Sequence, residues 1–207
     1  MRNRGLIISF LVLIILGILI YINPGQFFTK ALLRLTGDYA TPEYETDASI
    51  LSKTKSENLY YDRLYKIKNF KTFNEFQKKK LAAVPFVQIY NRNKQMITIA
   101  SGNECSWALM NFFNKKDTLN LVAGDSLMYD YVVDRLIPID FKTNADTFNY
   151  YVLSGWTNYL PKLSERLFAQ TNKMRAALGD KVCFSYVNFD FQDEWKEEMD
   201  SLDRSKQ

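Results

Sequence analysis

The chain has 207 residues, of which 47% are hydrophobic and 15% aromatic, with two cysteines and no histidine. This length provides one domain with a core large enough to fold unaided. The net charge of +4 comes from 27 basic and 23 acidic side chains scattered along the sequence. Phosphate neutralisation needs a concentrated basic face, so this pattern argues against a nucleic-acid partner.

The lack of histidine excludes several kinds of chemistry. Histidine is the usual base near neutral pH and the commonest nitrogen ligand of metals. Ser-His-Asp and Cys-His catalysis are therefore excluded. Cys105 and Cys183 are too few for a structural zinc site of the Cys/His kind. We expect no metal and no cofactor, and the sequence favours a protein that is not an enzyme.

The N-terminal segment is apolar enough to cross a membrane. Residues 6–22 read LIISFLVLIILGILIYI, at the short end of what spans about 30 Å of hydrocarbon. Arg2 and Arg4 precede this segment, and no basic residue follows it until Lys30. Positive charge stays on the cytoplasmic side. We therefore expect a single-pass membrane protein with a cytoplasmic N-terminus and an extracytoplasmic C-terminal domain, periplasmic in a Gram-negative bacterium.

A cleaved secretory signal is the alternative interpretation of this segment. Signal sequences have a shorter apolar stretch, roughly 7–15 residues, and end at a small-x-small cleavage site. Here the apolar stretch is followed by YINPGQFF, which contains no such site. The pattern therefore favours a retained anchor, and either interpretation exports the domain.

The sequence suggests three parts. Residues 1–25 are the cytoplasmic stub and transmembrane anchor, residues 26–65 a juxtamembrane segment and tether, and residues 66–207 the soluble domain. The juxtamembrane segment begins as an amphipathic stretch at the membrane surface or as an extension of the anchor helix. Residues 37–58 are polar and lack the periodicity of a helix or strand, which is typical of a tether.

The first half of the soluble domain is predicted to contain a helix, a hairpin and a second helix. Phe73 and Phe76 have helical spacing within residues 70–80. Alternating apolar residues at 87–90 and 97–99 flank a polar turn and predict a β-hairpin. The second helix is expected after Asn103 as its N-cap. Its predicted apolar face consists of Trp107, Met110 and Phe113.

The second half of the domain is predicted to contain a strand, a helix and another strand. Residues 150–156, YYVLSGW, and residues 181–190, KVCFSYVNFD, have the composition of buried strands. The helix between them has Asn158 as candidate cap, Pro161 in its first turn and Gly179 at its end. This order predicts a βαβ unit with parallel strands.

From Trp156 onwards the chain resembles the thioredoxin superfamily, particularly its membrane-anchored bacterial redoxins. The family carries a tryptophan, then a Cys-x-x-Cys at the head of the first long helix, then a strand ending in Val-Asn-x-Asp. Trp156 matches the tryptophan, and Leu160 and Leu163 stand at the two cysteine positions. The end of the strand matches at Val187, Asn188 and Asp190.

The resemblance implies an α/β fold, with a thioredoxin-like sheet and flanking helices preceded by one N-terminal transmembrane helix. It also implies a lost redox site, because dithiol exchange needs a thiolate and a resolving thiol and two leucines provide neither. In the family a helix, a cis-proline and a hairpin follow the βαβ unit. Here Val84, Pro85 and the hairpin precede it, so the resemblance implies a permuted order.

The function implied by the resemblance is a membrane-tethered protein-binding or assembly module. The family holds an extended peptide between its strand-to-helix turn and its proline loop. The corresponding peptide-binding surface here consists of Trp156, Tyr159, Leu160, Pro161, Val84 and Pro85. The alternative is that Tyr159 and Leu160 only fill the core.

Cys105 suggests a second function, a single-cysteine thiol-disulfide redox protein. It stands near a predicted helix start, where the helix dipole lowers a thiol pKa. The competing interpretation is a buried structural cysteine, which is also the interpretation favoured for Cys183 inside its predicted strand.

A third function is suggested by Ser126. Residues 124–127 read GDSL and resemble the nucleophile block of the GDSL-type esterases. That family needs a histidine to take the serine proton, and the chain has none. The sequence therefore favours an ordinary turn over an esterase-like hydrolase.

Overall fold

The computed structural model describes residues 38–79, 81, 83–115, 128–143 and 148–204. The chain divides into two compact units, residues 1–40 and 41–207, and the elements below all belong to the second. No helix within the described ranges is long and apolar enough to cross a membrane. The predicted anchor at residues 6–22 lies outside those ranges.

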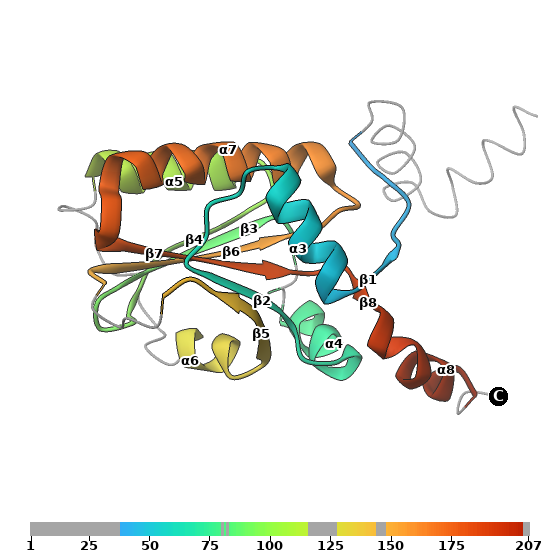
Figure 1. Ribbon diagram of the computed structural model, residues 1–207. Helices are drawn as coiled ribbons and strands as arrows, with labels where there is room; N and C mark the ends of the chain where they lie inside the picture. The colour runs from blue at the N-terminus through green and yellow to red at the C-terminus, as the bar shows by residue number, and fades with distance from the viewer. Residues whose placement is uncertain (1–37, 80, 82, 116–127, 144–147, 205–207) are drawn as a thin grey trace, which may run out of the picture. The chain divides into compact units, whose positions relative to one another are not determined.

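Three parallel strands form the centre of a six-stranded sheet (Figure 1). They are β6 (Tyr150–Trp156), β7 (Val182–Asn188) and β2 (Arg63–Ile67). β7 pairs in parallel with β6 on one side and with β2 on the other. β7 and β2 are buried along their whole length, as is typical of strands covered on both faces.

Antiparallel strands complete the sheet on both sides, in the order β4-β3-β6-β7-β2-β5. β3 (Phe86–Asn91) and β4 (Met96–Ser101) form a hairpin, and β3 also pairs antiparallel with β6. β5 (Leu136–Phe141) pairs antiparallel with β2. The fold is therefore mixed α/β with a central sheet, as the sequence predicts.

Helices cover both faces of this sheet (Figure 1). On one face α5 (Glu104–Lys115) and α7 (Pro161–Leu178) bury aliphatic and aromatic side chains against β6 and β7. On the other face α4 (Phe70–Lys78) and α6 (Met128–Val133) do the same. The second core is especially aromatic and includes Phe73, Phe76, Tyr129, Tyr151 and Phe189.

A second, two-stranded sheet joins segments from the two ends of the domain. β1 (Tyr44–Glu45) precedes α3 (Asp47–Ser56) and pairs in parallel with β8 (Phe191–Gln192). β8 leads into the short 3-10 helix η2 (Asp193–Trp195) and the final helix α8 (Lys196–Arg204). β8 follows the end of β7 almost directly in the chain, which places the small sheet near the carboxyl edge of the central sheet.

Several predicted elements are confirmed. The predicted helix at residues 70–80 is α4, the predicted hairpin is β3–β4, and the predicted βαβ unit is β6–α7–β7. α7 begins with Pro161 and is followed by Gly179, whose φ of 59° lies in the left-handed region that favours glycine. The 3-10 helix η1 (Gly179–Lys181) then leads into β7.

Part of the predicted tether is structured. Residues 44–67 contain β1, α3 and β2, whereas the sequence pattern assigns the soluble domain a start at residue 66. α3 escapes a periodicity search because its buried residues are Ile50 and Thr54 alone, too few for an apolar stripe. β2 escapes because its buried residues include Arg63 and Lys66.

The buried face of α5 differs from the predicted one. Cys105, Leu109 and Phe112 are buried, whereas Trp107 is 69% exposed and Met110 is 44% exposed. The apolar residues of α5 lie around its whole circumference, so helical periodicity is compatible with two different buried faces. Packing against β3 and α7 decides between them.

Candidate functional site

A polar cluster lies at the carboxyl ends of β6 and β7, the edge where open α/β sheets usually bind ligands. Asp190, just after β7, is 2% exposed. Its two carboxylate oxygens accept the backbone N–H of Asn158 at 3.0 and 2.9 Å. It also accepts a hydrogen bond from the Thr157 hydroxyl. Asp190 thereby holds the turn that connects β6 to α7.

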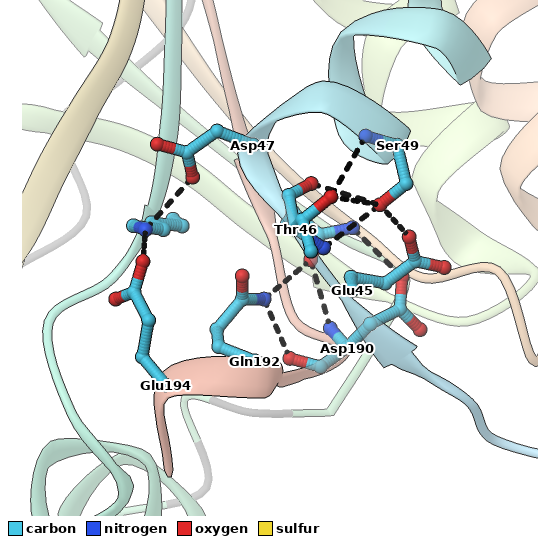
Figure 2. Close-up of polar contacts among 9 residues, drawn as sticks. Glu45, Thr46, Asp47, Ser49, Asp190, Gln192 and Glu194 are labelled. Atoms are coloured by element: carbon cyan, nitrogen blue, oxygen red, sulfur yellow. Dashed lines mark hydrogen bonds and ion pairs between the residues drawn. The ribbon is translucent and has the colours of Figure 1, made fainter.

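Side chains at and just after the end of β7 in turn hold Asp190. The Asn188 amide donates to Asp190 Oδ2 at 2.7 Å. Gln192 Nε2 donates to Asn188 Oδ1 at 2.9 Å and to the Asp190 carbonyl oxygen at 2.8 Å (Figure 2). Burial raises the pKa of Asp190, and the hydrogen bonds from Thr157, Asn158 and Asn188 partly oppose that rise.

Residues 45–49, at the end of β1 and the start of α3, complete the cluster (Figure 2). The Asn158 amide donates to Glu45 Oε1 at 2.7 Å, and the Ser49 hydroxyl donates to Glu45 Oε2. Thr46 and Ser49 form a capping box that begins α3. The sequence predicted Asn158 as the N-cap of α7, and this prediction is wrong. Leu160 occupies the N-cap position, and its side chain makes no capping hydrogen bond.

Lys66 connects three elements beside this cluster. Its ammonium lies 2.7 Å from Asp47 Oδ1 at the start of α3 and 2.6 Å from Glu194 Oε1 in η2. The Lys66 side chain is 4% exposed. Burial alone would lower its pKa, but the hydrogen bonds to the two carboxylates outweigh burial and raise it. The two ion pairs connect β2 to the start of α3 and to η2.

An open groove of about 460 Å³ adjoins the turn, between β1, α3 and Asn158. Its lining includes Glu43, Glu45, Ser52 and Lys53, so it presents hydroxyl and charged groups. Within the described part of the chain, no group of three or more His, Cys, Asp or Glu residues could hold a metal ion. The hydrogen bonds of Asp190, Asn188 and Gln192 are suited to fixing the shape of the turn between β6 and α7.

The predicted peptide-binding residues near the turn differ in their exposure. Tyr159, Leu160 and Pro161 are partly buried. Trp156 is fully buried and its ring packs 5.3 Å from that of Phe168. Trp156 therefore lies in the core on the α7 side of the sheet, and any role for it at a contact surface would be as support beneath that surface.

The proline segment lies beside the same end of β6. Phe86 pairs with Gly155 in antiparallel register, so the register continued by one residue brings Pro85 next to Trp156. The Val84–Pro85 peptide bond is cis. Val84 is partly buried and Pro85 is buried.

Cys105 does not have the environment of a reactive thiol. It is 2% exposed, and its thiol donates to the carbonyl oxygen of Pro85 at 3.3 Å. Burial raises its pKa to about 12, which overrides the lowering expected from the helix start. Cys183 is buried in β7, and neither cysteine forms a disulfide. Ser126 lies outside the described residues.

Sequence reasoning missed Glu45, Lys66 and Gln192. A Thr-x-x-Ser pattern at residues 46–49 was an available signal for the start of α3. Asn188, Asp190 and Gln192 alternate along the chain, which places them on one side of an extended segment.

Comparison with protein-family models, curated proteins and solved structures finds no match to this chain.

Proposed function

We propose that this protein is a membrane-anchored, extracytoplasmic binding or assembly module built on a thioredoxin-like domain without a dithiol site. The arrangement of the sheet supports this proposal. The βαβ unit β6–α7–β7 and the hairpin β3–β4 share one sheet through the pairing of β3 with β6. A permuted chain order would therefore keep the family's elements adjacent in space.

The observation that carries the proposal is the buttressed turn after β6. Asp190 fixes the turn through the Asn158 backbone and the Thr157 hydroxyl. Leu160 then stands at the N-cap of α7, where the resembled family has its nucleophilic cysteine. A rigid turn with an apolar side chain in that place suits recognition, because a pre-organised surface loses less entropy on binding.

The proposed contact surface is smaller than the one expected from the sequence. It consists of Tyr159, Leu160, Pro161 and Val84, with Pro85 and Trp156 as buried support. An apolar, partly exposed group of this kind beside polar Asn158 has the composition of a protein contact. The partner we propose is an extended polypeptide segment.

The test is site-specific photocrosslinking in cells that carry the full-length chain. A photoreactive residue replaces Tyr159, and the matched control replaces exposed Glu165 on the outer side of α7. We expect a partner polypeptide to crosslink at residue 159 and not at residue 165. Equal labelling at both positions, or none at residue 159, contradicts the proposal.

Serine substitutions separate contact from core packing. We expect Tyr159→Ser and Leu160→Ser to remain folded by circular dichroism and to lose the crosslink from a reporter placed at Val84. Unfolding of both variants supports the alternative that these side chains fill the core. Retained crosslinking in folded variants contradicts the proposed surface.

The membrane topology has its own test. Protease added to cells with an opened outer envelope should digest the chain beyond about residue 37, because the Arg2 and Arg4 charges favour a cytoplasmic N-terminus. Protection of the domain until the cytoplasmic membrane is lysed contradicts this topology.

A further inference from the structure

A second hollow lies on the hairpin side of the sheet, beside the Val84–Pro85 segment. Its volume is about 200 Å³, and its lining includes Leu81, Ala83, Phe86, Gln88, Ile99 and Glu104. Ligand pockets for drug-sized molecules are usually about 300–1,000 Å³. This smaller, half-enclosed hollow has room for one large side chain.

Gln88 gives the hollow a buried polar group. The residue is 1% exposed, and its Oε1 accepts the Tyr90 hydroxyl proton at 2.7 Å. Its Nε2 has no hydrogen-bond partner among the described residues. The Nε2 atom is not fully buried, so a group placed in the hollow can reach it. It can donate to an occupant that carries an acceptor atom at the end of an apolar body.

The hollow adjoins an edge of the sheet. β4 is the last strand on its side, and no described strand pairs with its outer edge. Ile99 in β4 lines the hollow and is 50% exposed. An extended peptide that adds to such an edge gains main-chain hydrogen bonds and directs alternate side chains to one face of the sheet. One of these side chains would lie above Ile99.

Glu104 adds a charge at the rim. It is exposed and forms no ion pair with a described residue. Residues two apart in an added strand face the same side of the sheet. A basic residue two positions from the inserted side chain would therefore complement Glu104.

We propose that β4 and this hollow bind an extended peptide segment that inserts a tyrosine side chain and places a basic residue two positions away. The tyrosine ring fills the apolar walls, its hydroxyl oxygen accepts the Gln88 Nε2 proton, and the basic side chain pairs with Glu104. Ala83 and Phe86 of the hollow flank Val84 and Pro85 in the chain, but the site shares no residue with the contact surface proposed above. Substitutions of Gln88 and Glu104 therefore test it separately from the proposed function.

The experiment uses the full-length chain in detergent micelles and a fluorescein-labelled probe, Thr-Val-Thr-Tyr-Thr-Lys-Thr-Val-Thr, with blocked ends. Fluorescence anisotropy compares this probe with a version carrying Phe in place of Tyr and another carrying Glu in place of Lys. We expect the Phe probe to bind about 3- to 10-fold more weakly, as loss of one hydrogen bond implies. The Glu probe should bind still more weakly and should lose the salt sensitivity of the original.

Variants of the protein sharpen the test. Gln88→Leu should weaken the Tyr probe and leave the Phe probe unchanged, Glu104→Gln should act only on probes with Lys, and Glu165→Gln is the matched surface control. If Gln88→Leu does not fold, the difference between the Tyr and Phe probes on the unaltered protein decides. No binding, equal binding of all probes, or a dimer that Ile99→Lys dissociates overturns the proposal, the last because a second copy then occupies the edge.

Discussion

The two carboxylate oxygens of Asp190 lie 3.0 and 2.9 Å from the backbone nitrogen of Asn158. This contact joins the segment after β7 to the turn after β6, two places 32 residues apart in the chain. Because Asp190 is buried, neither the carboxylate nor the N–H can exchange this partner for bulk water. The turn is therefore held by Asp190 together with the Ser164 hydroxyl, which donates to the Thr157 carbonyl oxygen at 2.8 Å.

Asp190→Ala should destabilise the domain strongly. The substitution leaves the Asn158 N–H and the Asn188 amide without this acceptor, and an unsatisfied buried polar group costs about 1–3 kcal/mol. Urea denaturation measures the loss. Glu165→Ala, at an exposed position, is the control and should change the free energy of unfolding by less than about 0.5 kcal/mol. Equal effects of the two substitutions would contradict the role of Asp190.

The raised pKa of Asp190, caused mainly by burial, predicts a pH dependence. The folded state holds this proton more tightly than the unfolded state, whose carboxyl pKa is about 3.9. Stability contributed by this group therefore decreases as pH rises from about 3.9 through the folded-state value. Asp190→Asn cannot ionise, so its stability relative to the unaltered protein should improve as pH rises from 4 to 8. A difference that stays constant with pH contradicts the prediction.

Lys66 predicts an asymmetry between two ways of breaking its ion pairs. Asp47→Asn combined with Glu194→Gln leaves a buried ammonium without a carboxylate, which costs about 3–5 kcal/mol. Lys66→Met instead leaves two carboxylates whose side chains are 50% and 61% exposed, and these remain hydrated. Thermal unfolding should show the double substitution to be the more damaging. The reverse order would show that the Lys66 charge is not the buried partner.

Cys105 should resist alkylation in the folded protein. With a pKa of about 12 against an ordinary value of 9.0, the thiolate at pH 8 is roughly 1,000-fold less populated than for a free thiol. Iodoacetamide should therefore modify Cys105 only after addition of denaturant, as followed by mass spectrometry. Rapid modification of the native protein would restore the single-cysteine redox hypothesis. Retained disulfide-reductase activity in Cys105→Ser would contradict both hypotheses.

Gly155 should not tolerate a methyl group. A Cβ at this position would lie 2.1 Å from Phe86 Cε1, because the Phe86 ring covers the glycine across the β3–β6 pair. Gly155→Ala is expected to cost about 1–3 kcal/mol through overpacking. Adding Phe86→Leu should recover part of that loss, giving a favourable coupling in a double-mutant cycle. Additive losses would show that the two residues do not share this contact.

Local patterns in the sequence were sufficient for the regular elements with strong periodicity or clear ends. The Phe73 and Phe76 spacing predicted α4, alternation predicted the hairpin, and Pro161 with Gly179 bounded α7. These features depend on residues close in the chain, where side-chain spacing and φ preferences act directly. The mixed α/β class followed from the order of these elements.

Only the tertiary structure decided which polar residues are buried and which residues of the predicted site are accessible. Burial of Lys66 in β2 depends on Asp47 and Glu194, which come from opposite ends of the domain. Trp156 and Cys105 are both buried, beneath α7 and beside the proline segment respectively, which no local pattern specifies. The sequence by itself determined the composition, the apolar N-terminal segment and the local elements. Contacts across more than 30 residues determined the site, since desolvation and hydrogen bonding there depend on neighbours that no local pattern specifies.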